Sequence, residues 1–473
     1  MNLWLSMHLN SPEILLVCGL LCIVLIDLIL PVGYRRCVTF YLSEILLLVL
    51  GLLLIQEWNM PVQSLFSGHY VFDNFAVGFK GMAALLTFLV FAYAKREDAF
   101  SDYLSEFFLL SLLSLLGAMV VVSALSLITL YLGLELLSLP MYALVALKRD
   151  SAHATEAAMK YFVLGALASA FLLFGFSLFY GLFGSIYLSQ IAMHINIAML
   201  MSPLFLVALS FILVAVSFKL GLFPFHMWVP DVYQGAPLSV VALLSSIAKL
   251  AAFALLVRVL FNGLAPLHFA ASPWLLFLGL LSLIFGNLVA LMQKNIKRLL
   301  GYSSVANMGM VFIALGLSTV TGLTSSAFYL LAYAFMTVAM LGLLIVVMPN
   351  IETVDQLKGL NKDHPFVAFL FLLVLLSFAG IPPLLGFDAK LLVIMSLLYQ
   401  GHLFMSILVV LMSVIGAAYY LRIAKAIYFE ASEAPIHFNA SGWGFALVGA
   451  NALALLGFGI FPNGAMMMVQ HFF

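Results

Sequence analysis

Six cationic side chains lie inside the apolar stretches of this sequence, and they are the residues whose position most clearly calls for a chemical role. They are Lys80, Lys160, Lys219, Lys249, Arg258 and Lys390, whereas the other thirteen Lys and Arg residues lie in gaps between the stretches. A cation placed in hydrocarbon costs about 2.5–3.5 kcal/mol on insertion scales. Because only 8% of all residues are charged, we expect several of these buried cations to be retained for function.

The chemistry open to a buried amine is the reversible loss of a proton. Burial lowers the pKa of a lysine and a nearby carboxylate raises it, so a lysine subject to both influences can exchange its proton near neutral pH. Arginine cannot do this, because its pKa is too high. Glu135, in YLGLELLSLP, is the natural partner of Lys219. We therefore predict that the two residues form a switchable pair in a proton path; the alternative is a static buried ion pair, which stabilises little.

Four further residues extend the predicted proton path. Lys249, in SSIAKLAAF, is placed to take a proton from Lys219 along ordered waters. Lys390 is the candidate exit site, and its neighbour Asp388 is expected to tune it. Tyr420 is a candidate for holding waters, with aromatic packing as the alternative role.

The remaining candidates each have an ordinary structural explanation as well. His226 follows a predicted helix break, where it is expected either to relay protons or to pack as a common buried histidine. Lys160 is either an uptake site or a lysine that extends to the membrane surface. Arg258 is expected to extend outward to the surface in the same way, and Lys80 lies toward the outer part of its helix.

The elements that must position these residues are membrane helices. The 473 residues are 65% hydrophobic with a formal net charge of 0, and their mean hydropathy is +1.21, which is typical of a polytopic all-α membrane protein. Fourteen apolar runs of spanning length begin near residues 11, 37, 72, 104, 124, 155, 203, 237, 273, 300, 324, 365, 403 and 442. The stretch 186–198 is too short and polar to span, and we interpret it as interfacial.

Composition and motifs also exclude several function classes. The neutral net charge argues against a nucleic-acid partner. The sequence contains neither a G-x-G-x-x-G nor a Walker motif, and it lacks the cysteine and histidine spacing of iron–sulfur, haem or zinc sites. The gaps between runs leave no room for a soluble catalytic domain. We therefore predict no cofactor and no metal in this chain.

The cations in the gaps predict the orientation of the chain. They follow the first, third, fifth, ninth, eleventh and thirteenth runs, and none follows an even-numbered run; they are Arg35, Arg36, Lys95, Arg96, Lys148, Arg149, Lys294, Lys297, Arg298, Lys358, Lys362, Arg422 and Lys425. Cationic loops stay on the cytoplasmic side. Both termini are therefore predicted to lie on the outer side.

An internal repeat is predicted from two runs that proline and glycine interrupt. These are the seventh, FKLGLFPFHMWVPDVYQGAP, and the twelfth, AGIPPLLGFDAK. Matched interruptions in two halves indicate an ion site near the membrane midplane. Lys219 and Lys390 are 171 residues apart, and this offset sets Asn307 opposite Glu135 within one residue. We predict N-terminal helices in 1–103, a five-helix repeat in 104–262, a second, inverted one in 263–428, and a last helix in 429–473.

These motifs resemble the antiporter-like subunits of respiratory complex I, the proton-pumping NADH:quinone oxidoreductase. The resemblance rests on FKLGLFPFHMWVPDVYQGAP, YLGLELLSLPMYALVAL, GNLVALMQKNIKRLLGYSSVANMG and GIPPLLGFDAK, and it extends over essentially the whole chain. Bacteria have three such subunits, L, M and N. A lysine at position 390, the wording PDVYQGAP and an end soon after the fourteenth run are typical of subunit N.

The resemblance implies fourteen helices, an inverted repeat and proton translocation along a buried polar axis. Four residues match the functional glutamate and lysines of the family by motif: Glu135, Lys219, Lys249 and Lys390. Two departures are visible. The family often has histidine where this chain has Asn307, which cannot titrate, and its usual A-P-T-P becomes Ala236–Ser239, so we expect a less constrained turn there.

The sequence therefore predicts a membrane subunit of a proton-translocating NADH:quinone oxidoreductase in a bacterial inner membrane, with periplasmic termini. NADH, flavin, iron–sulfur clusters and quinone are expected in partner subunits, and the chain itself is expected to contact lipid, ordered waters and other membrane subunits. Two alternatives stay open. One is a subunit of a multisubunit cation/proton antiporter, and the other is an assembly scaffold that transports nothing.

Overall fold

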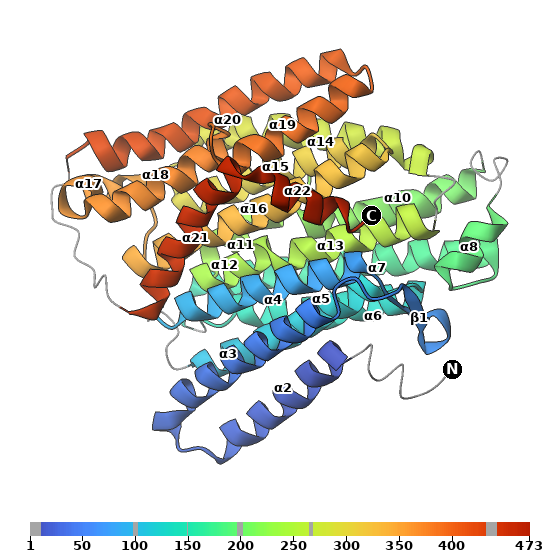
Figure 1. Cartoon of the computed structure of the whole chain (residues 1–473), viewed down its shortest axis with the longest axis horizontal. Coiled ribbons are helices and arrows are strands. Elements are labelled where there is room, and N and C mark those ends of the chain that lie inside the picture. The colour runs from blue at the N-terminus through green and yellow to red at the C-terminus, as the bar shows by residue number, and fades with distance from the viewer. Residues whose placement is uncertain (1–10, 98–102, 149, 196–201, 264–267, 432–441) are drawn as a thin grey trace.

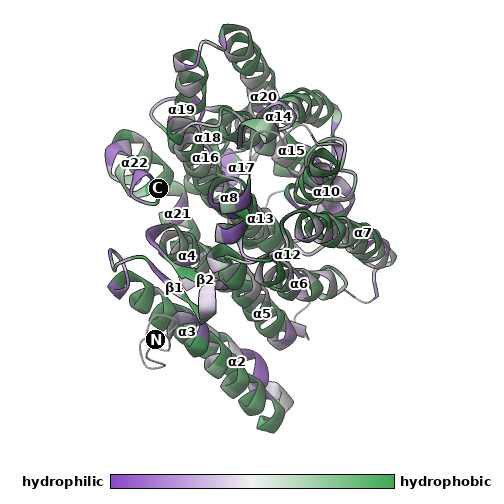
Figure 2. Ribbon diagram, turned by 90° about the vertical axis from the view of Figure 1, so that its right-hand side faces the viewer, coloured by the Kyte–Doolittle hydropathy of each residue, from purple (hydrophilic) through white to green (hydrophobic). Residues whose placement is uncertain are grey.

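The computed structural model describes residues 11–97, 103–148, 150–195, 202–263, 268–431 and 442–473, which form one bundle of helices that lie side by side (Figure 1). Thirteen helices in these residues are long and apolar enough to cross a membrane. The predicted twelfth span is two shorter helices separated by a break. Figure 2 shows that the helices are mostly hydrophobic along their lengths. The prediction of a polytopic all-α membrane protein is confirmed.

The N-terminal part combines three long helices with a short β-hairpin. Its elements are α2 (Ser11–Ile29), α3 (Val32–Gln56), β1 (Gln63–Leu65), the 3-10 turn η1 (Phe66–Gly68), β2 (Tyr70–Phe72) and α4 (Asn74–Ala94). The strands are antiparallel, with Gln63 opposite Phe72. Asp73 begins α4, because its carboxylate accepts a hydrogen bond from the Ala76 N–H at 2.8 Å and so caps the first turn. The hairpin therefore leads directly into the helix that carries Lys80.

The middle of the chain contains the first group of helices expected to form a repeat. These are α5 (Leu104–Ser123), α6 (Leu127–Val145), α7 (Ala152–Phe183), α8 (Leu188–His194), α10 (Pro203–Leu220), α11 (Trp228–Gly235), α12 (Leu238–Ser245), α13 (Ile247–Val257) and the π-turn η3 (Arg258–Gly263). The short α8 lies in the segment predicted to be interfacial.

The second group follows the same order as the first. Two long helices pair as a helical hairpin, one long helix follows, and then comes a helix that is interrupted by a break. Its elements are α14 (His268–Met292), α15 (Ile296–Gly316), α16 (Val320–Val347), η5 (Val354–Leu357), α17 (Leu360–Asp363), α18 (Pro365–Ala379), α19 (Leu385–Tyr399) and α20 (Leu403–Phe429). The chain then continues with α21 (Trp443–Ile460) and α22 (Pro462–Gln470).

The tightest helix pairs in the two groups pack through small residues. An added Cβ on Gly133 of α6 would collide with the Val121 backbone of α5, and one on Gly309 of α15 would collide with the Gly279 backbone of α14. Small residues allow close approach of membrane helices, where packing rather than water drives association. Each pair is thereby fixed as a hairpin on which other helices pack.

The two predicted helix breaks are confirmed, and both begin at a left-handed glycine. Gly221 ends α10 with φ 77°, and Gly380 ends α18 with φ 82°. A side chain is disfavoured at such φ values, which is why glycine is required there. The two glycines are 159 residues apart, not 171 as the lysines are. Lys219 therefore precedes its break, whereas Lys390 follows the other one.

Matched hydrogen bonds also join the start of α6 to the segment after α7 and the start of α15 to the segment after α16. The Leu127 N–H donates to the Ile186 carbonyl at 2.9 Å, and the Ile296 N–H donates to the Glu352 carbonyl at 2.9 Å. The first link lies at the β-hairpin end of the bundle, where Ala124 bridges Tyr70. These contacts favour an inverted repeat, whose boundaries stay a prediction.

The turn between α11 and α12 is held by charged residues. Both oxygens of Glu97, which is 1% exposed, accept backbone hydrogen bonds, from Leu238 at 2.8 Å and from Ser239 at 3.0 Å. Lys297 donates to the Ala236 carbonyl at 3.1 Å. A carboxylate at a helix N-terminus pairs with free N–H groups and with the helix dipole. Ser239 stands where the family usually has a second proline, and we expected this change to loosen the turn. The hydrogen bonds of Glu97 and Lys297 hold the turn in place of that proline.

Removing the Glu97 carboxylate should destabilise the assembled protein. In Glu97→Ala, two buried N–H groups lose their acceptors, at a cost of about 1–3 kcal/mol each. We expect a lower thermal midpoint in detergent, followed by light scattering or intrinsic fluorescence. Glu106→Ala is the matched control, because Glu106 is an exposed glutamate at the start of α5. Equal midpoints for the two variants would contradict the role given to Glu97.

Candidate functional site

Six cations lie inside the predicted membrane spans, and we call them the in-span cations. Three of them lie close to a helix interruption: Lys219, Lys249 and Lys390. Lys219 lies in the last turn of α10 before Gly221, Lys249 lies in the first turn of α13 after the irregular Ser246, and Lys390 lies early in α19. Interruptions leave backbone carbonyls without helical partners. Lys390 bonds to such carbonyls, whereas Lys219 and Lys249 bond to side chains of α6 and α15.

Lys219 is bound by hydroxyl groups of α6. Its Nζ donates to Ser138 Oγ at 2.8 Å and to Tyr142 OH at 3.3 Å, and the residue is 8% exposed. Glu135, Ser138 and Tyr142 follow each other at i, i+3 and i+7, so they share one face of α6. Sequence reasoning missed Ser138, although this helical spacing from Glu135 was visible in the sequence.

Glu135 does not contact Lys219 directly. No ion pair joins them among the described residues, and one buried Glu135 oxygen has no hydrogen-bond partner. The predicted pair is therefore found in an open arrangement, with Ser138 rather than the carboxylate next to the amine. Glu135 is half-buried on the outer surface of the described chain, so its environment depends on what covers α6.

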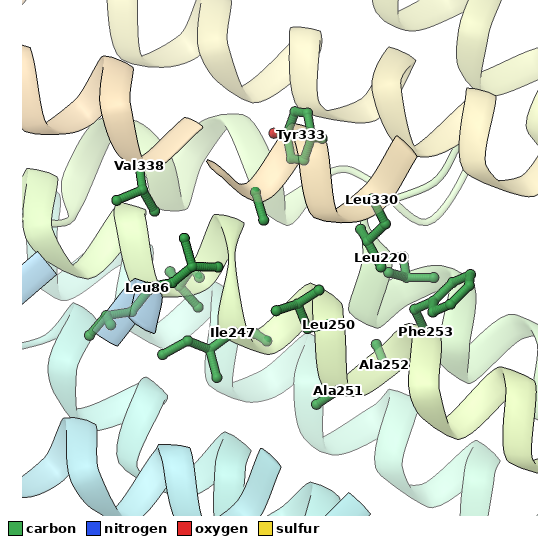
Figure 3. Close-up of a cluster of buried hydrophobic side chains, with 14 of the residues drawn as sticks. Leu86, Leu220, Ile247, Leu250, Ala251, Ala252, Phe253, Leu330, Tyr333 and Val338 are labelled. Carbon is green, nitrogen blue, oxygen red and sulfur yellow. The ribbon is translucent and has the colours of Figure 1, made fainter. Parts of the chain in front are cut away.

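Lys249 is the most deeply buried of the three amines. It is 1% exposed, its Nζ donates to Ser304 Oγ of α15, and it lies 5.0 Å from the centre of the Tyr333 ring. Figure 3 shows the apolar side chains around α13, among them Ile247, Leu250 and Phe253. Tyr233 OH also donates to Ser304 Oγ, at 3.4 Å. The amine thus has neutral partners in an apolar environment.

Lys390 is held by the end of the preceding half-helix. Its Nζ donates to the carbonyls of Phe378 at 2.8 Å and Ala379 at 2.9 Å, the last residues of α18. These carbonyls lack helical partners and lie at the negative end of the helix dipole. Asp388 does not bond to Lys390, and its Oδ2 is buried without a partner. No direct contact therefore supports the prediction that Asp388 tunes Lys390.

Hydroxyl and amide groups lie between Lys249 and Lys390, although no hydrogen bond among the described residues joins Ser304, the Lys249 partner, to Ser303. Ser303, next to Ser304 on α15, shares a hydrogen bond with Tyr420 OH, and Asn307 donates to the Ser303 carbonyl at 2.7 Å. Tyr420, Asn307 and Lys390 line a cavity of about 20 Å³, which is room for one water. Asn307, where the family often has histidine, thus orients Ser303.

Two of the four possible relay residues, His226 and Lys160, lie apart from these groups. The His226 ring packs against Phe223, Phe285 and Tyr302, and its Nδ1 has no partner among the described residues. Lys160, whose side chain is 43% exposed, pairs with Asp231 and Glu156, each at 2.8 Å. The first placement is that of a packing histidine, and the second is that of a surface ion pair.

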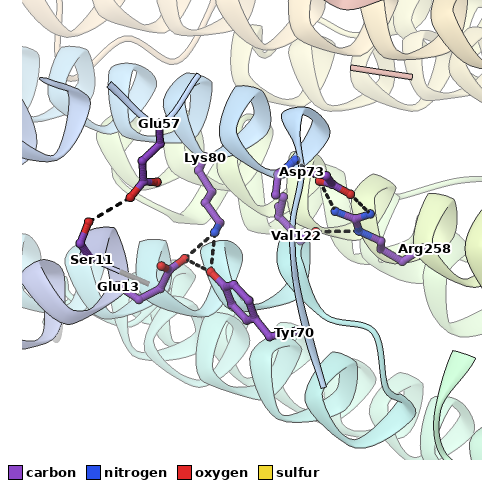
Figure 4. Close-up of polar contacts among 9 residues, drawn as sticks. Ser11, Glu13, Glu57, Tyr70, Asp73, Lys80, Val122 and Arg258 are labelled. Carbon is purple, nitrogen blue, oxygen red and sulfur yellow. Dashed lines mark hydrogen bonds and ion pairs between the residues drawn. The ribbon is translucent and has the colours of Figure 1, made fainter. Parts of the chain in front are cut away.

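The other two in-span cations are fully paired (Figure 4). Lys80 pairs with Glu13 at 2.7 Å. Arg258 is 2% exposed and donates to both Asp73 oxygens, at 2.6 and 2.8 Å. The prediction that Arg258 extends to the surface was wrong, because Asp73 and the Val122 carbonyl supply partners inside the protein. Burial alone would raise the pKa of the Asp73 carboxyl, but the Arg258 guanidinium holds it below its usual range.

The six cations therefore divide by their partners. Lys80, Lys160 and Arg258 each have a carboxylate within 4 Å, whereas Lys219, Lys249 and Lys390 have none among the described residues. An ammonium group buried without a counter-ion is costly, so such a group tends to lose its proton. The three amines without a carboxylate are thus the ones that chemistry allows to switch charge.

The chain is similar to known proteins over nearly its whole length. Residues 124–416 match the family described as "NADH:quinone oxidoreductase/Mrp antiporter, TM". It is 41% identical to "NADH-quinone oxidoreductase subunit N" of Ruthia magnifica subsp. Calyptogena magnifica over 100% of this chain and 98% of that one. It is 43% identical to the protein of the same name from Laribacter hongkongensis, over 98% and 96% of the two chains.

Two solved structures share the fold. A chain of respiratory complex I from Thermus thermophilus with bound Aureothin aligns with a TM-score of 0.85 and 33% identity, over 98% of this chain and 100% of that one. A chain of the Mrp complex from a Dietzia species aligns with a TM-score of 0.86 over 98% and 96% of the two chains. The second is 21% identical, so that likeness concerns the fold alone.

Neutralising a paired and an unpaired cation should have opposite effects on stability. Lys249→Met removes a charge without a counter-ion and should leave the thermal midpoint of the assembled protein unchanged or raise it. Arg258→Met leaves Asp73 buried without its cation, which is destabilising by about 3–5 kcal/mol. Thermal unfolding in detergent measures both. If Lys249→Met were the less stable variant, the division by partners would be wrong.

Proposed function

The chain belongs to the NADH:quinone oxidoreductase/Mrp antiporter family and, within it, to the NADH-quinone oxidoreductase subunits N, and from this premise we propose that it moves protons along a buried axis of Lys219, Lys249 and Lys390. Such chains are membrane subunits of complex I, an oxidoreductase and translocase. The observation that carries the proposal is that these three amines, of which Lys219 and Lys249 are buried and Lys390 is half-buried, have no carboxylate in contact among the described residues.

The proposed switch is the distance between Glu135 and Lys219. When the carboxylate is close, it favours the ammonium form of the lysine; when it moves away, burial favours the neutral amine. The open arrangement, with Ser138 at 2.8 Å from the amine, corresponds to the state that releases a proton. Because Glu135 is half-buried on the surface of α6, a neighbouring subunit can act on it directly.

The released proton is proposed to pass to Lys249 and then toward Lys390. Between Lys219 and Lys249 the described residues supply no continuous hydrogen bonds, so ordered waters must complete that step. Beyond Lys249, hydroxyl groups can both donate and accept, and Ser304, Ser303 and Tyr420 provide them. A water in the cavity beside Tyr420 would complete the connection to the Lys390 amine.

The driving free energy is proposed to come from partner subunits. Moving one charge against 100 mV costs about 2.3 kcal/mol. NADH, flavin, iron–sulfur clusters and quinone are proposed to lie in partner subunits, in keeping with the complex I relatives of this chain. We place the chain in a bacterial inner membrane with both termini on the periplasmic side, following its cationic gaps.

A cation/proton antiporter subunit is the second candidate function, favoured by the family match over residues 124–416, whose description names the Mrp antiporter as well. Purified membranes separate the two functions. The proposed function predicts NADH-dependent proton uptake, and the alternative predicts that sodium dissipates a preset pH gradient without NADH. A non-transporting scaffold predicts that Lys249→Met and Lys390→Met leave proton flux intact.

Changes at the switch should abolish function without preventing assembly. We expect Lys219→Ala and Glu135→Ala to assemble and to lose most NADH oxidation linked to proton pumping, because neither variant retains the exchanging pair. NADH oxidase activity and fluorescence quenching of a pH probe in inverted vesicles measure this. Normal pumping in both variants would refute the assignment.

The hydroxyl link can be tested by removing a single oxygen. Tyr420→Phe breaks the bond to Ser303 and should lower the pumping rate about a hundredfold or more, at the lower end of the range of about 10²–10⁴ by which one positioned proton-transfer group typically changes a rate. The matched control is Tyr93→Phe, because Tyr93 is equally buried and bonds to Asn451 between α4 and α21. Equal rates for the two variants would exclude Tyr420 from the path.

A further inference from the structure

A second group of titratable side chains lies away from the lysine axis, at the β-hairpin end of the N-terminal helices. Glu13 of α2, Glu57 at the end of α3, Tyr70 of β2 and Lys80 of α4 meet there (Figure 4). All four are between 2% and 6% exposed. Nothing in the proposed proton axis uses them, since no hydrogen bond joins Lys80 to Lys219, Lys249 or Lys390 among the described residues.

Three of these residues form a closed triangle of hydrogen bonds. Lys80 Nζ contacts Glu13 Oε1 at 2.7 Å and donates to Tyr70 OH at 2.5 Å. Tyr70 OH in turn donates to the same Glu13 oxygen at 2.6 Å. This arrangement satisfies the ammonium group and one carboxylate oxygen, and it leaves the other Glu13 oxygen, Oε2, buried without a partner.

Glu57 adds a second carboxyl group to the cluster. Ser11 Oγ donates to its Oε1 at 2.9 Å, and no cation lies within ion-pair distance of Glu57 among the described residues. The group thus contains two buried carboxyl groups and a single ammonium group. If both carboxyl groups were ionised, one negative charge would be buried in excess, which low-polarity surroundings strongly disfavour.

We propose that Glu13, Glu57, Tyr70 and Lys80 form a proton-binding site that takes up one proton, carried by Glu57. The proton balances the second carboxylate, while Lys80 balances the first. A bound proton lets the cluster stay neutral without any further ligand. This site does not rest on the proposed function, because it follows from the charge balance of the N-terminal helices alone.

The electrostatics of Glu57 agree with this assignment. Burial raises the pKa of Glu57 to about 7; the Ser11 hydrogen bond and the Lys80 charge oppose the rise, and the Glu13 charge adds to it. Among the described residues, the other charged groups that face the cluster are Asp73 and Arg258, which neutralise each other. His471 is the remaining titratable neighbour in this part of the chain, since its ring stacks on Trp58 and it bonds to Asn59.

Proton binding should strengthen the attachment of the α2–α3 hairpin to the bundle. The pKa of Glu57 is higher in the folded protein than the ordinary value of 4.5, so its contribution to stability is complete below pH 4.5 and is lost as the pH rises through about 7. The hairpin is therefore expected to be held more firmly at low pH than at high pH.

Hydrogen exchange of the assembled protein, resolved by mass spectrometry, tests the site. Peptides from α2 and α3 should lose protection as the pH rises, with a midpoint near 7 after correction for intrinsic rates. Glu57→Gln should abolish this pH dependence. Glu13→Gln should move the midpoint to lower pH, because a neighbouring negative charge is removed, and Lys80→Met should move it to higher pH.

The controls separate this proposal from its alternatives. His471→Gln should leave the midpoint in place; if it removed the transition instead, the proton would belong to His471 and the proposal would fail. Persistence of the transition in Glu57→Gln, or its absence in the unmodified protein, would also overturn the proposal. Lys219→Ala, which tests the lysine axis, should leave the hairpin transition unchanged, so the two proposals fail independently.

Discussion

The cost of burying charge is the constraint on which the rest of this structure depends. A charge in an apolar interior must be paired, satisfied by hydrogen bonds, or able to disappear by proton transfer. Arg258 cannot lose its proton and is paired with Asp73, whereas Lys249 has a serine and an aromatic ring as its partners. The partner that each cation finds therefore separates residues that hold the bundle together from residues that can carry protons.

Helix interruptions supply ligands for one member of the second class of cation, Lys390. A continuous membrane helix uses all its backbone acceptors internally, so a buried amine on it would find few partners. Gly221 and Gly380 end two half-helices inside the bundle, and the freed carbonyls of Phe378 and Ala379 bind Lys390. The same backbone irregularity that weakens a helix thus supplies neutral ligands for an exchangeable proton.

Charged residues with fixed partners hold helices in place, while the lysines of the proposed axis exchange protons. Glu97 holds the start of α12, Asp73 and Arg258 join the start of α4 to the end of α13, and Lys80 attaches α2. These contacts leave Glu135 and Asp388 as carboxylates near the axis without an ion pair among the described residues, and for Glu135 this is consistent with a role in which it moves relative to Lys219.

The sequence by itself determined the membrane class and the two breaks, because hydropathy, glycine and proline act locally along the chain. It did not determine which cation meets which carboxylate. Lys80 and Glu13 belong to different helices, Arg258 and Asp73 are 185 residues apart, and Ser304 reaches Lys249 from α15. Only the tertiary structure decided these contacts, because they depend on how each helix is rotated and packed against helices distant in sequence.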